Sequence, residues 1–207
     1  MPDDFELLDR WRSGDRTAGN ELFERHFGAV YRFFRNKAAD AIDDLTQRTF
    51  LACAEHQSAF RQEASFRTYL FAIARNELRA HIRRLHRGVD VDPQTQSIMD
   101  LVVSMRQRLT DAEDHRRLLF GLCQLPLDYQ IALELHYWEG LTVEEIARVL
   151  DVPLGTAKSR LRRGRDRLAR NVADLGDDAP IPEVTLANLD RWSSEIRAKL
   201  DAESQAP

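Results

Sequence analysis

Proline is absent between residues 3 and 92, and the 207-residue chain holds only nine glycines. Because these two residues are the strongest helix breakers, their scarcity favours long helices over strands and tight turns. No apolar run approaches the roughly 18 residues of a membrane span, so membrane insertion is not expected. The first twelve residues hold several acids and no apolar stretch, so we expect no signal peptide there.

Groups that support catalysis or metal binding are also scarce. The only two cysteines, Cys53 and Cys123, lie in helix-like segments, which favours small core residues in a reducing cytoplasm over a disulfide scaffold. The histidines and cysteines show no metal-ligand spacing, and the glycines form no phosphate-binding loop. No pair of acids suggests general acid–base catalysis. We therefore expect no enzyme activity, no cofactor and no metal site.

Charge is unevenly distributed along the chain. The net charge of −4 does not by itself suggest a nucleic-acid binder. Residues 61–87 nevertheless carry +5 and residues 154–170 carry +6, whereas residues 88–153 carry −7 and residues 171–207 carry −5. Basic blocks within an acidic chain are typical of phosphate binding. The alternative is that both blocks are solvated helix faces.

Apolar residues recur at intervals of three and four, which predicts an all-α protein. The first helical face comprises Leu22, Phe23, Phe27, Val30, Tyr31 and Phe34. A second face comprises Ile42, Leu45, Thr49 and Cys53, and a third, with Ser65 as its N-cap, comprises Phe71, Ala74, Leu78, Ile82 and Leu85. These helices are enough to close one core of about 85 residues.

The remainder of the chain divides into three parts. Residues 88–111 are predicted to be a flexible acidic linker, because a glycine, a proline and a polar run interrupt the periodicity there, with a short helix possible at 98–109. Residues 112–172 form a second helical unit. A Pro-x-Pro break follows, and the acidic extension 173–207 contains an amphipathic segment at 186–200. This segment either folds back on the basic blocks, packs as a plain stabilising helix, or frays as a terminus.

Residues 142–168 have the pattern of a helix-turn-helix. Thr142 and Glu145 form a capping box that fixes the start of the first helix, and residues 151–153 form the turn. The second helix places its apolar residues at steps of three and four: Leu154, Ala157, Leu161, Gly164 and Leu168. The polar side of this helix is expected to carry Lys158, Arg160, Arg162, Arg163, Arg165 and Arg167.

An arginine-rich helix of this kind fits the major groove of DNA, where arginine reads guanine edges. We expect Arg160 and Arg162 to be the main base or phosphate readers, and Lys158 and Arg165 to contact phosphates. The alternative is an ordinary surface helix with a solvated basic face.

The first basic block differs because aromatic residues are interleaved with its arginines. The block contains Phe60, Phe66, Tyr69 and Phe71 together with Arg61, Arg67, Arg75, Arg79, Arg83 and Arg84. Aromatics that stack on bases and arginines that hold the backbone are typical of single-strand binding. Phe66 and Phe71 fall on apolar helical positions and are expected in the core. Phe60 lies in a loop-like stretch and is expected to contact nucleic acid.

Four segments in order are DLTQRTF at 44–50, SFRTYLFAIARN at 65–76, LTVEEIA at 141–147 and GTAKSRL at 155–161. Together they resemble the extracytoplasmic-function sigma factors of bacterial RNA polymerase, the two-domain members of the sigma-70 family. The resemblance covers residues 5–170. It implies an all-α chain with sigma domain 2 at 1–87 and a helix-turn-helix sigma domain 4 at 112–172.

The resemblance also implies partners and roles. Asp43, Asp44 and Gln47 would dock on the clamp helices of core RNA polymerase. The alternative is that Asp40, Asp43 and Asp44 simply cap their helix. Phe60 and Asn76 match positions that hold a flipped-out base of the single-stranded −10 element. The helix-turn-helix would read the duplex −35 element, and the linker would pass through the RNA exit path.

The full DNA-binding set that we predict is Phe60, Arg61, Tyr69, Arg75, Asn76, Arg79, Arg83, Arg84, Thr156, Lys158, Ser159, Arg160, Arg162, Arg163 and Arg165. The resemblance leaves room for an anti-sigma factor as a further partner. The competing interpretation is a repressor or activator with one C-terminal DNA-binding domain, and the third is a DNA-processing enzyme such as a recombinase. The repressor or activator does not explain why Asn76, Phe60 and seven arginines cluster in the N-terminal half. The recombinase would need a nucleophilic serine or tyrosine beside clustered acids or arginines.

Overall fold

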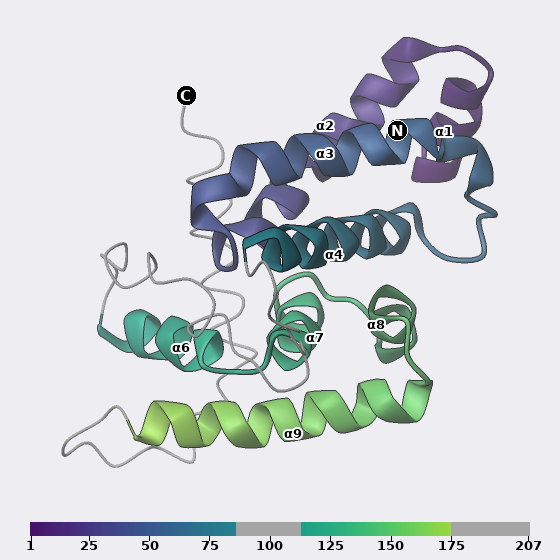
Figure 1. The fold of residues 1–207 in the computed structure, drawn as a ribbon. Helices are drawn as coiled ribbons and strands as arrows, with labels where there is room; N and C mark the ends of the chain where they lie inside the picture. The colour runs from purple at the N-terminus through teal and green to yellow at the C-terminus, as the bar shows by residue number, and fades with distance from the viewer. Residues whose placement is uncertain (86–112, 175–207) are drawn as a thin grey trace. The chain divides into compact units, whose positions relative to one another are not determined.

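The computed structural model describes residues 1–85 and 113–174, and every regular element in these two ranges is a helix (Figure 1). The prediction of an all-α protein is confirmed. The chain divides after His81 into two compact units. None of the described helices combines the length and the apolar character that a membrane span requires. The predicted linker 88–111, its short helix and the segment 186–200 lie outside the described residues.

The first unit opens with two helices that pack against each other, α1 (Asp4–Arg12) and α2 (Arg16–Arg35). Asp3 caps α1 in a capping box with Glu6, and Asp15 caps α2 by accepting hydrogen bonds from two backbone amides. Helix α1 was not predicted as a separate helix, although the Asp3-x-x-Glu6 pattern indicates a helix start.

The remaining helices of the first unit are α3 (Ile42–Glu55), which follows the 3-10 turn η1 (Ala39–Ala41), and α4 (Phe66–Leu85). A second 3-10 turn, η2 (Gln57–Ala59), follows α3. The hydroxyl of Ser65 accepts a hydrogen bond from the backbone amide of Thr68, so the predicted N-cap of α4 is confirmed.

The core of the first unit contains most of the predicted apolar residues. Buried members include Leu22, Val30, Phe34, Leu45, Cys53, Phe66, Phe71 and Leu78. Two expectations were wrong, because Phe27 and Leu85 are exposed. Phe27 lies against the rings of Tyr31 and Phe50 at the edge of the core, where neighbours cover only one side of it.

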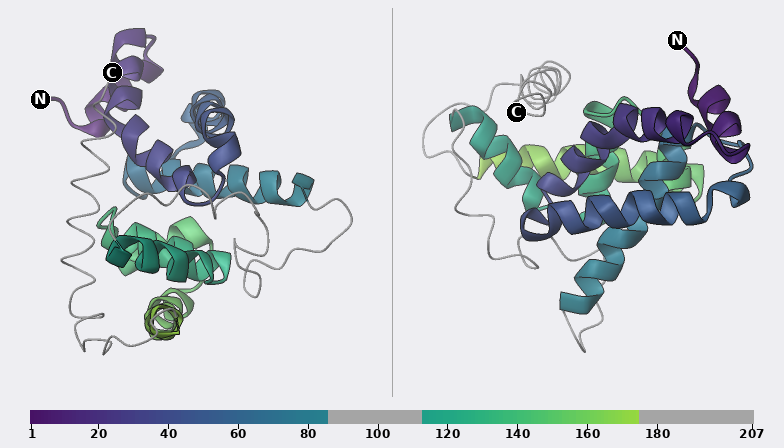
Figure 2. Two further views of the ribbon diagram at one scale, coloured as in Figure 1. Left: turned by 90° about the vertical axis from the view of Figure 1, so that its left-hand side faces the viewer. Right: turned by 90° about the horizontal axis from the view of Figure 1, so that it is seen from above.

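The second unit contains α6 (Glu113–Cys123), α7 (Leu127–Tyr137), α8 (Val143–Leu150) and α9 (Leu154–Ala173). Helix α7 is buried along most of its length, whereas α9 lies at one edge of the unit with α6 and α7 on one side of it (Figures 1 and 2). Gly164 permits this close approach, because a Cβ there would lie 3.3 Å from Leu133.

Helices α8 and α9 form the predicted helix-turn-helix. The capping box of Thr142 and Glu145 is present at the start of α8. Asp151 ends α8 in the left-handed conformation, at φ 51°, and thereby reverses the chain direction into α9. Of the predicted apolar stripe on α9, Ala157, Leu161, Gly164 and Leu168 are buried, whereas Leu154 is exposed at the first turn.

Candidate nucleic-acid interface

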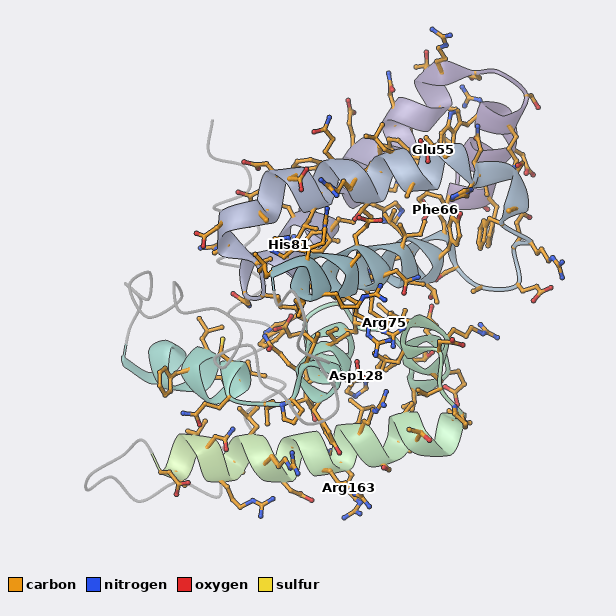
Figure 3. All side chains as sticks on the ribbon, viewed as in Figure 1. Glu55, Phe66, Arg75, His81, Asp128 and Arg163 are labelled. Carbon is orange, nitrogen blue, oxygen red and sulfur yellow. The ribbon has the colours of Figure 1, made fainter. Side chains whose placement is uncertain are left out.

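Helix α9 presents a strongly basic face to solvent. Lys158, Arg162, Arg163 and Arg165 are all exposed, and Figure 3 shows Arg163 on the side of α9 that faces away from α7. Nη1 of Arg162 lies 3.8 Å from Oδ2 of Asp166, one turn along the helix. Thr156 and Ser159, also predicted to contact DNA, are half-buried at the N-terminal half of the same helix. This arrangement suits a phosphate backbone, because the basic groups project from a rigid helix whose opposite side is packed.

Arg160 is the main correction on this helix. We expected it on the polar face, but its side chain is 6% exposed and its Nη1 lies 3.1 Å from Oδ2 of Asp128 on α7. Position 160 is three residues after Ala157 and four before Gly164, so it borders the buried stripe and faces α7. Asp128, 2% exposed and in the first turn of α7, was not singled out by our sequence analysis. Arg160 therefore joins two helices and is not available to DNA.

Arg167 also contacts α7 while remaining exposed. Its guanidinium carbon lies 5.2 Å from the centre of the Tyr129 ring. This contact is a cation–π interaction, which orients the arginine without removing it from solvent. The predicted DNA contacts of α9 that are exposed are therefore Lys158, Arg162, Arg163 and Arg165.

In the first unit, Phe60 is a second correction. Its side chain is only 8% exposed, and its ring stacks on Tyr69 with centroids 4.4 Å apart and an 18° tilt. The ring of Phe66 packs edge-on against the ring of Phe60, with centroids 6.3 Å apart. Because Phe60 is almost completely buried and one face of its ring is stacked on Tyr69, the structure presents no open ring surface there for a base. The loop pattern around Phe60 concealed this burial, because the covering residues come from α4.

Tyr69 is half-buried beside Phe60. Its hydroxyl donates a hydrogen bond to the carbonyl of His56 over 3.2 Å. Burial is the main cause that raises its pKa, so the phenol stays neutral and remains a donor at physiological pH.

Helix α4 sorts the predicted arginines by burial. Arg75 is buried within the described structure, where we had expected an exposed arginine, and Arg79 is half-buried. Asn76, Arg83 and Arg84 are exposed, as is Arg61 in the loop before α4. Tyr69, Asn76 and Arg83 are spaced by seven residues, about two helical turns, so they lie in one line along the solvent-facing side of α4.

The predicted polymerase-docking residues Asp43, Asp44 and Gln47 are exposed at the N-terminal end of α3. The alternative that the acids simply cap this helix is wrong, because the N-cap is Ala41 and no side-chain cap hydrogen bond is present. Asp44 instead accepts a 2.9 Å hydrogen bond from Nε of Arg48, one turn later. Two carboxylates at a helix start are favoured by the helix dipole.

Comparison with known proteins agrees with this arrangement. Residues 22–88 match the family model for Sigma-70 region 2, and residues 115–168 match the model for Sigma-70, region 4, which together make up more than half of the chain. The chain is 28% identical over 182 residues to the ECF RNA polymerase sigma-E factor of Haemophilus influenzae, covering 83% of this chain and 96% of the relative. It is 29% identical over 186 residues to the RNA polymerase sigma-H factor of Pseudomonas aeruginosa, covering 83% and 95%.

Two solved structures share the fold. One is the sigma factor RpoE in complex with the anti-sigma factor NepR from Bartonella quintana, with a TM-score of 0.59, 22% identity and coverage of 76% of this chain and 98% of that one. The other is CnrH in complex with the cytosolic domain of CnrY, with a TM-score of 0.59, 23% identity and coverage of 82% and 97%.

Proposed function

Since this chain is a promoter-specificity subunit of RNA polymerase, from the extracytoplasmic-function group of the sigma-70 family, we propose that each of its two units recognises a different promoter element. Residues 112–172 read the duplex −35 element through α9. Residues 1–87 dock on core polymerase and hold the single-stranded −10 element, and residues 88–111 connect the two. The chain acts in the cytoplasm, where polymerase and chromosome are, and has no catalysis of its own.

The observation that carries the −35 assignment is the basic face of α9. Lys158, Arg162, Arg163 and Arg165 project to solvent from a helix whose opposite side is fixed to α7 by Arg160. Major-groove recognition requires this combination of a rigid helix and accessible guanidinium groups.

Run-off transcription with core polymerase on a library of promoters tests the assignment. We expect core-dependent transcripts from the wild-type chain and a loss of about tenfold or more when Arg162, Arg163 and Arg165 are replaced together by alanine, since each phosphate or base contact contributes to affinity. Replacing Arg16, an exposed arginine on α2, is the matched control and should have little effect. A wild-type chain that neither binds core polymerase nor supports transcription would overturn the proposal.

For polymerase docking we propose Asp43, Asp44 and Gln47 at the start of α3. Asp43→Asn should weaken binding to core polymerase, because a basic partner loses a charged acceptor. Glu55→Gln removes an exposed acid at the other end of α3 and is the control (Figure 3). If Asp43→Asn binds core polymerase as tightly as Glu55→Gln does, Asp43 does not belong to the docking surface.

An anti-sigma factor is a further proposed partner. The support is the similar structure from Bartonella quintana, which was solved with such a protein. Affinity capture of the full chain from cells should recover a protein that blocks its core-dependent transcription when added back. Recovery of core polymerase alone would argue against this partner.

A further inference from the structure

The loop between α3 and α4 is held in place by a helix from the other end of the first unit. Arg12, in the last turn of α1, donates from Nε to the carbonyl of Gln57 over 3.1 Å. Its Nη2 also donates to that carbonyl and to the carbonyl of Phe60. One planar guanidinium therefore fixes two points of the loop backbone, a task that suits the fork geometry of arginine.

A second contact from α1 holds the tip of the same loop. Gln62 has φ 57°, a left-handed conformation that residues with a Cβ seldom adopt and that needs support from the surroundings. Its side-chain amide donates a 2.9 Å hydrogen bond to Oδ1 of Asp9. Asp9 lies one turn before Arg12 and its carboxylate is 3.7 Å from Nη1 of that arginine. The start and the tip of the loop are thus held by one turn of α1.

This clamp determines which side chains the loop presents. Phe60 turns inward onto Tyr69, while Arg61, Gln62 and Glu63 are exposed at the tip. The line of Tyr69, Asn76 and Arg83 along α4 starts beside the same loop. A single strand that follows this line would meet the loop tip, and the geometry of that tip depends on hydrogen bonds from α1.

We propose that Arg12, assisted by Asp9, is a positioning residue for −10 recognition, which acts by fixing the shape of loop 57–63. The inference rests on the proposed function of the first unit. Helix α1 lies outside residues 22–88, the part of the chain that matches Sigma-70 region 2, so that match gives Arg12 no role. Arg12 touches no DNA in this proposal. It determines selectivity through the loop.

The variant Arg12→Lys separates charge from geometry. It keeps the positive charge but loses the planar fork, so its side chain cannot hold the carbonyls of Gln57 and Phe60 together. Asp9→Ala removes the contact to Gln62 at an aspartate whose side chain is 65% exposed, where unfolding is not expected. The controls are Arg10→Lys, on the same helix and paired with Asp15, and Glu24→Ala, an exposed acid on α2.

The experiment measures run-off transcription by full-length chain with core polymerase. The templates are one active promoter and its single-base variants across the −10 element. The selectivity ratio is the transcript yield from the parent promoter divided by the yield from a −10 variant. Arg12→Lys should reduce this ratio by about tenfold, the order of effect of losing a charged hydrogen bond. Asp9→Ala should reduce it in the same direction, while both controls keep the wild-type ratio and −35 variants respond normally.

The outcomes are distinguishable. A loss of activity that is equal on all −10 sequences, or an unchanged ratio in both Arg12→Lys and Asp9→Ala, overturns the positioning role. If Arg12→Lys fails to fold in a thermal melt, the ratio for Asp9→Ala decides. Absence of any core-dependent transcription from the wild-type chain would instead overturn the proposed function. Wild-type activity together with unchanged ratios would overturn this inference alone.

Discussion

Arg160 on α9 and Asp128 on α7 form a buried ion pair, with Nη1 and Oδ2 3.1 Å apart. The arginine that the sequence suggested as a DNA reader instead packs between two helices, and it orients the helix that carries the proposed readers. A buried pair of this kind adds little net stability compared with apolar residues, but breaking it leaves one charge unpaired.

The first prediction concerns this pair. Arg160→Ala should destabilise the second unit by about 3–5 kcal/mol, because Asp128 then remains buried without its cation. Urea unfolding of the full chain, followed by circular dichroism, measures the change. The double variant Arg160→Met, Asp128→Leu should be much less destabilised than Arg160→Ala. If Arg160→Ala unfolds like the wild type, the pair does not support the second unit.

The second prediction concerns the exposed face of α9. Arg163→Ala should leave the urea midpoint unchanged and lower the slope of log affinity against log salt by about one unit on duplex promoter DNA, as expected for one lost phosphate contact. Fluorescence anisotropy at several salt concentrations gives the slope. A normal slope with relaxed preference at a single base pair would instead identify Arg163 as a base reader.

The third prediction places Phe60 in the core. Phe60→Ala should destabilise the first unit by about 3 kcal/mol, the lower end for a buried Phe→Ala change, since the ring stacks on Tyr69 but lies near the surface. Thermal melts and −10 single-strand binding should therefore decline together, and Phe60→Leu should recover most of both. Weakened single-strand binding in a fully stable Phe60→Ala variant would restore the direct stacking role.

The fourth prediction is a pH dependence that arises from His26. Burial lowers the pKa of this imidazole, and burial outweighs the opposing effect of Asp4, whose Oδ2 lies 2.7 Å from Nε2. The unfolded chain, with an ordinary pKa of about 6.5, therefore binds more protons than the folded chain as pH falls. Stability should be fully present above about pH 7 and should decline as pH drops through about 6.5.

Urea unfolding between about pH 7.5 and pH 5.5 measures this effect. His26→Gln removes the titrating group, so the variant should lose less stability over the same range than the wild type does. An identical pH slope in the two proteins would show that other groups account for the dependence.

Residues whose environment is local were predictable from the sequence. The capping box at Thr142, the turn at Asp151 and the N-cap at Ser65 depend on neighbours within a few positions, and all three are present. Residues whose partners are distant in sequence were not. Arg160 is buried because Asp128, 32 positions earlier, lies opposite it, and Phe60 is buried because α4 folds back over the loop.

The same distinction applies to the contacts of Arg12. Its partners Gln57 and Phe60 are 45 and 48 positions away, and the short surrounding sequence gives no sign of them. The left-handed backbone of Gln62 was not predictable either, because glycine or asparagine usually occupies such a position. Composition and periodicity found the helices and the basic blocks. They could not distinguish an arginine that binds a carbonyl of its own chain from one that binds DNA.

Each unit contains one buried thiol, Cys53 in the first and Cys123 in the second, and neither is in a disulfide. Burial raises the pKa of Cys53 to about 12, so almost none of it is thiolate near neutral pH. Alkylating reagents can consume such a thiol only when the surrounding helices open. The two cysteines are therefore native labels for local opening. Their modification rates, followed in one sample, can reveal whether polymerase protects one half of the chain before promoter DNA protects the other.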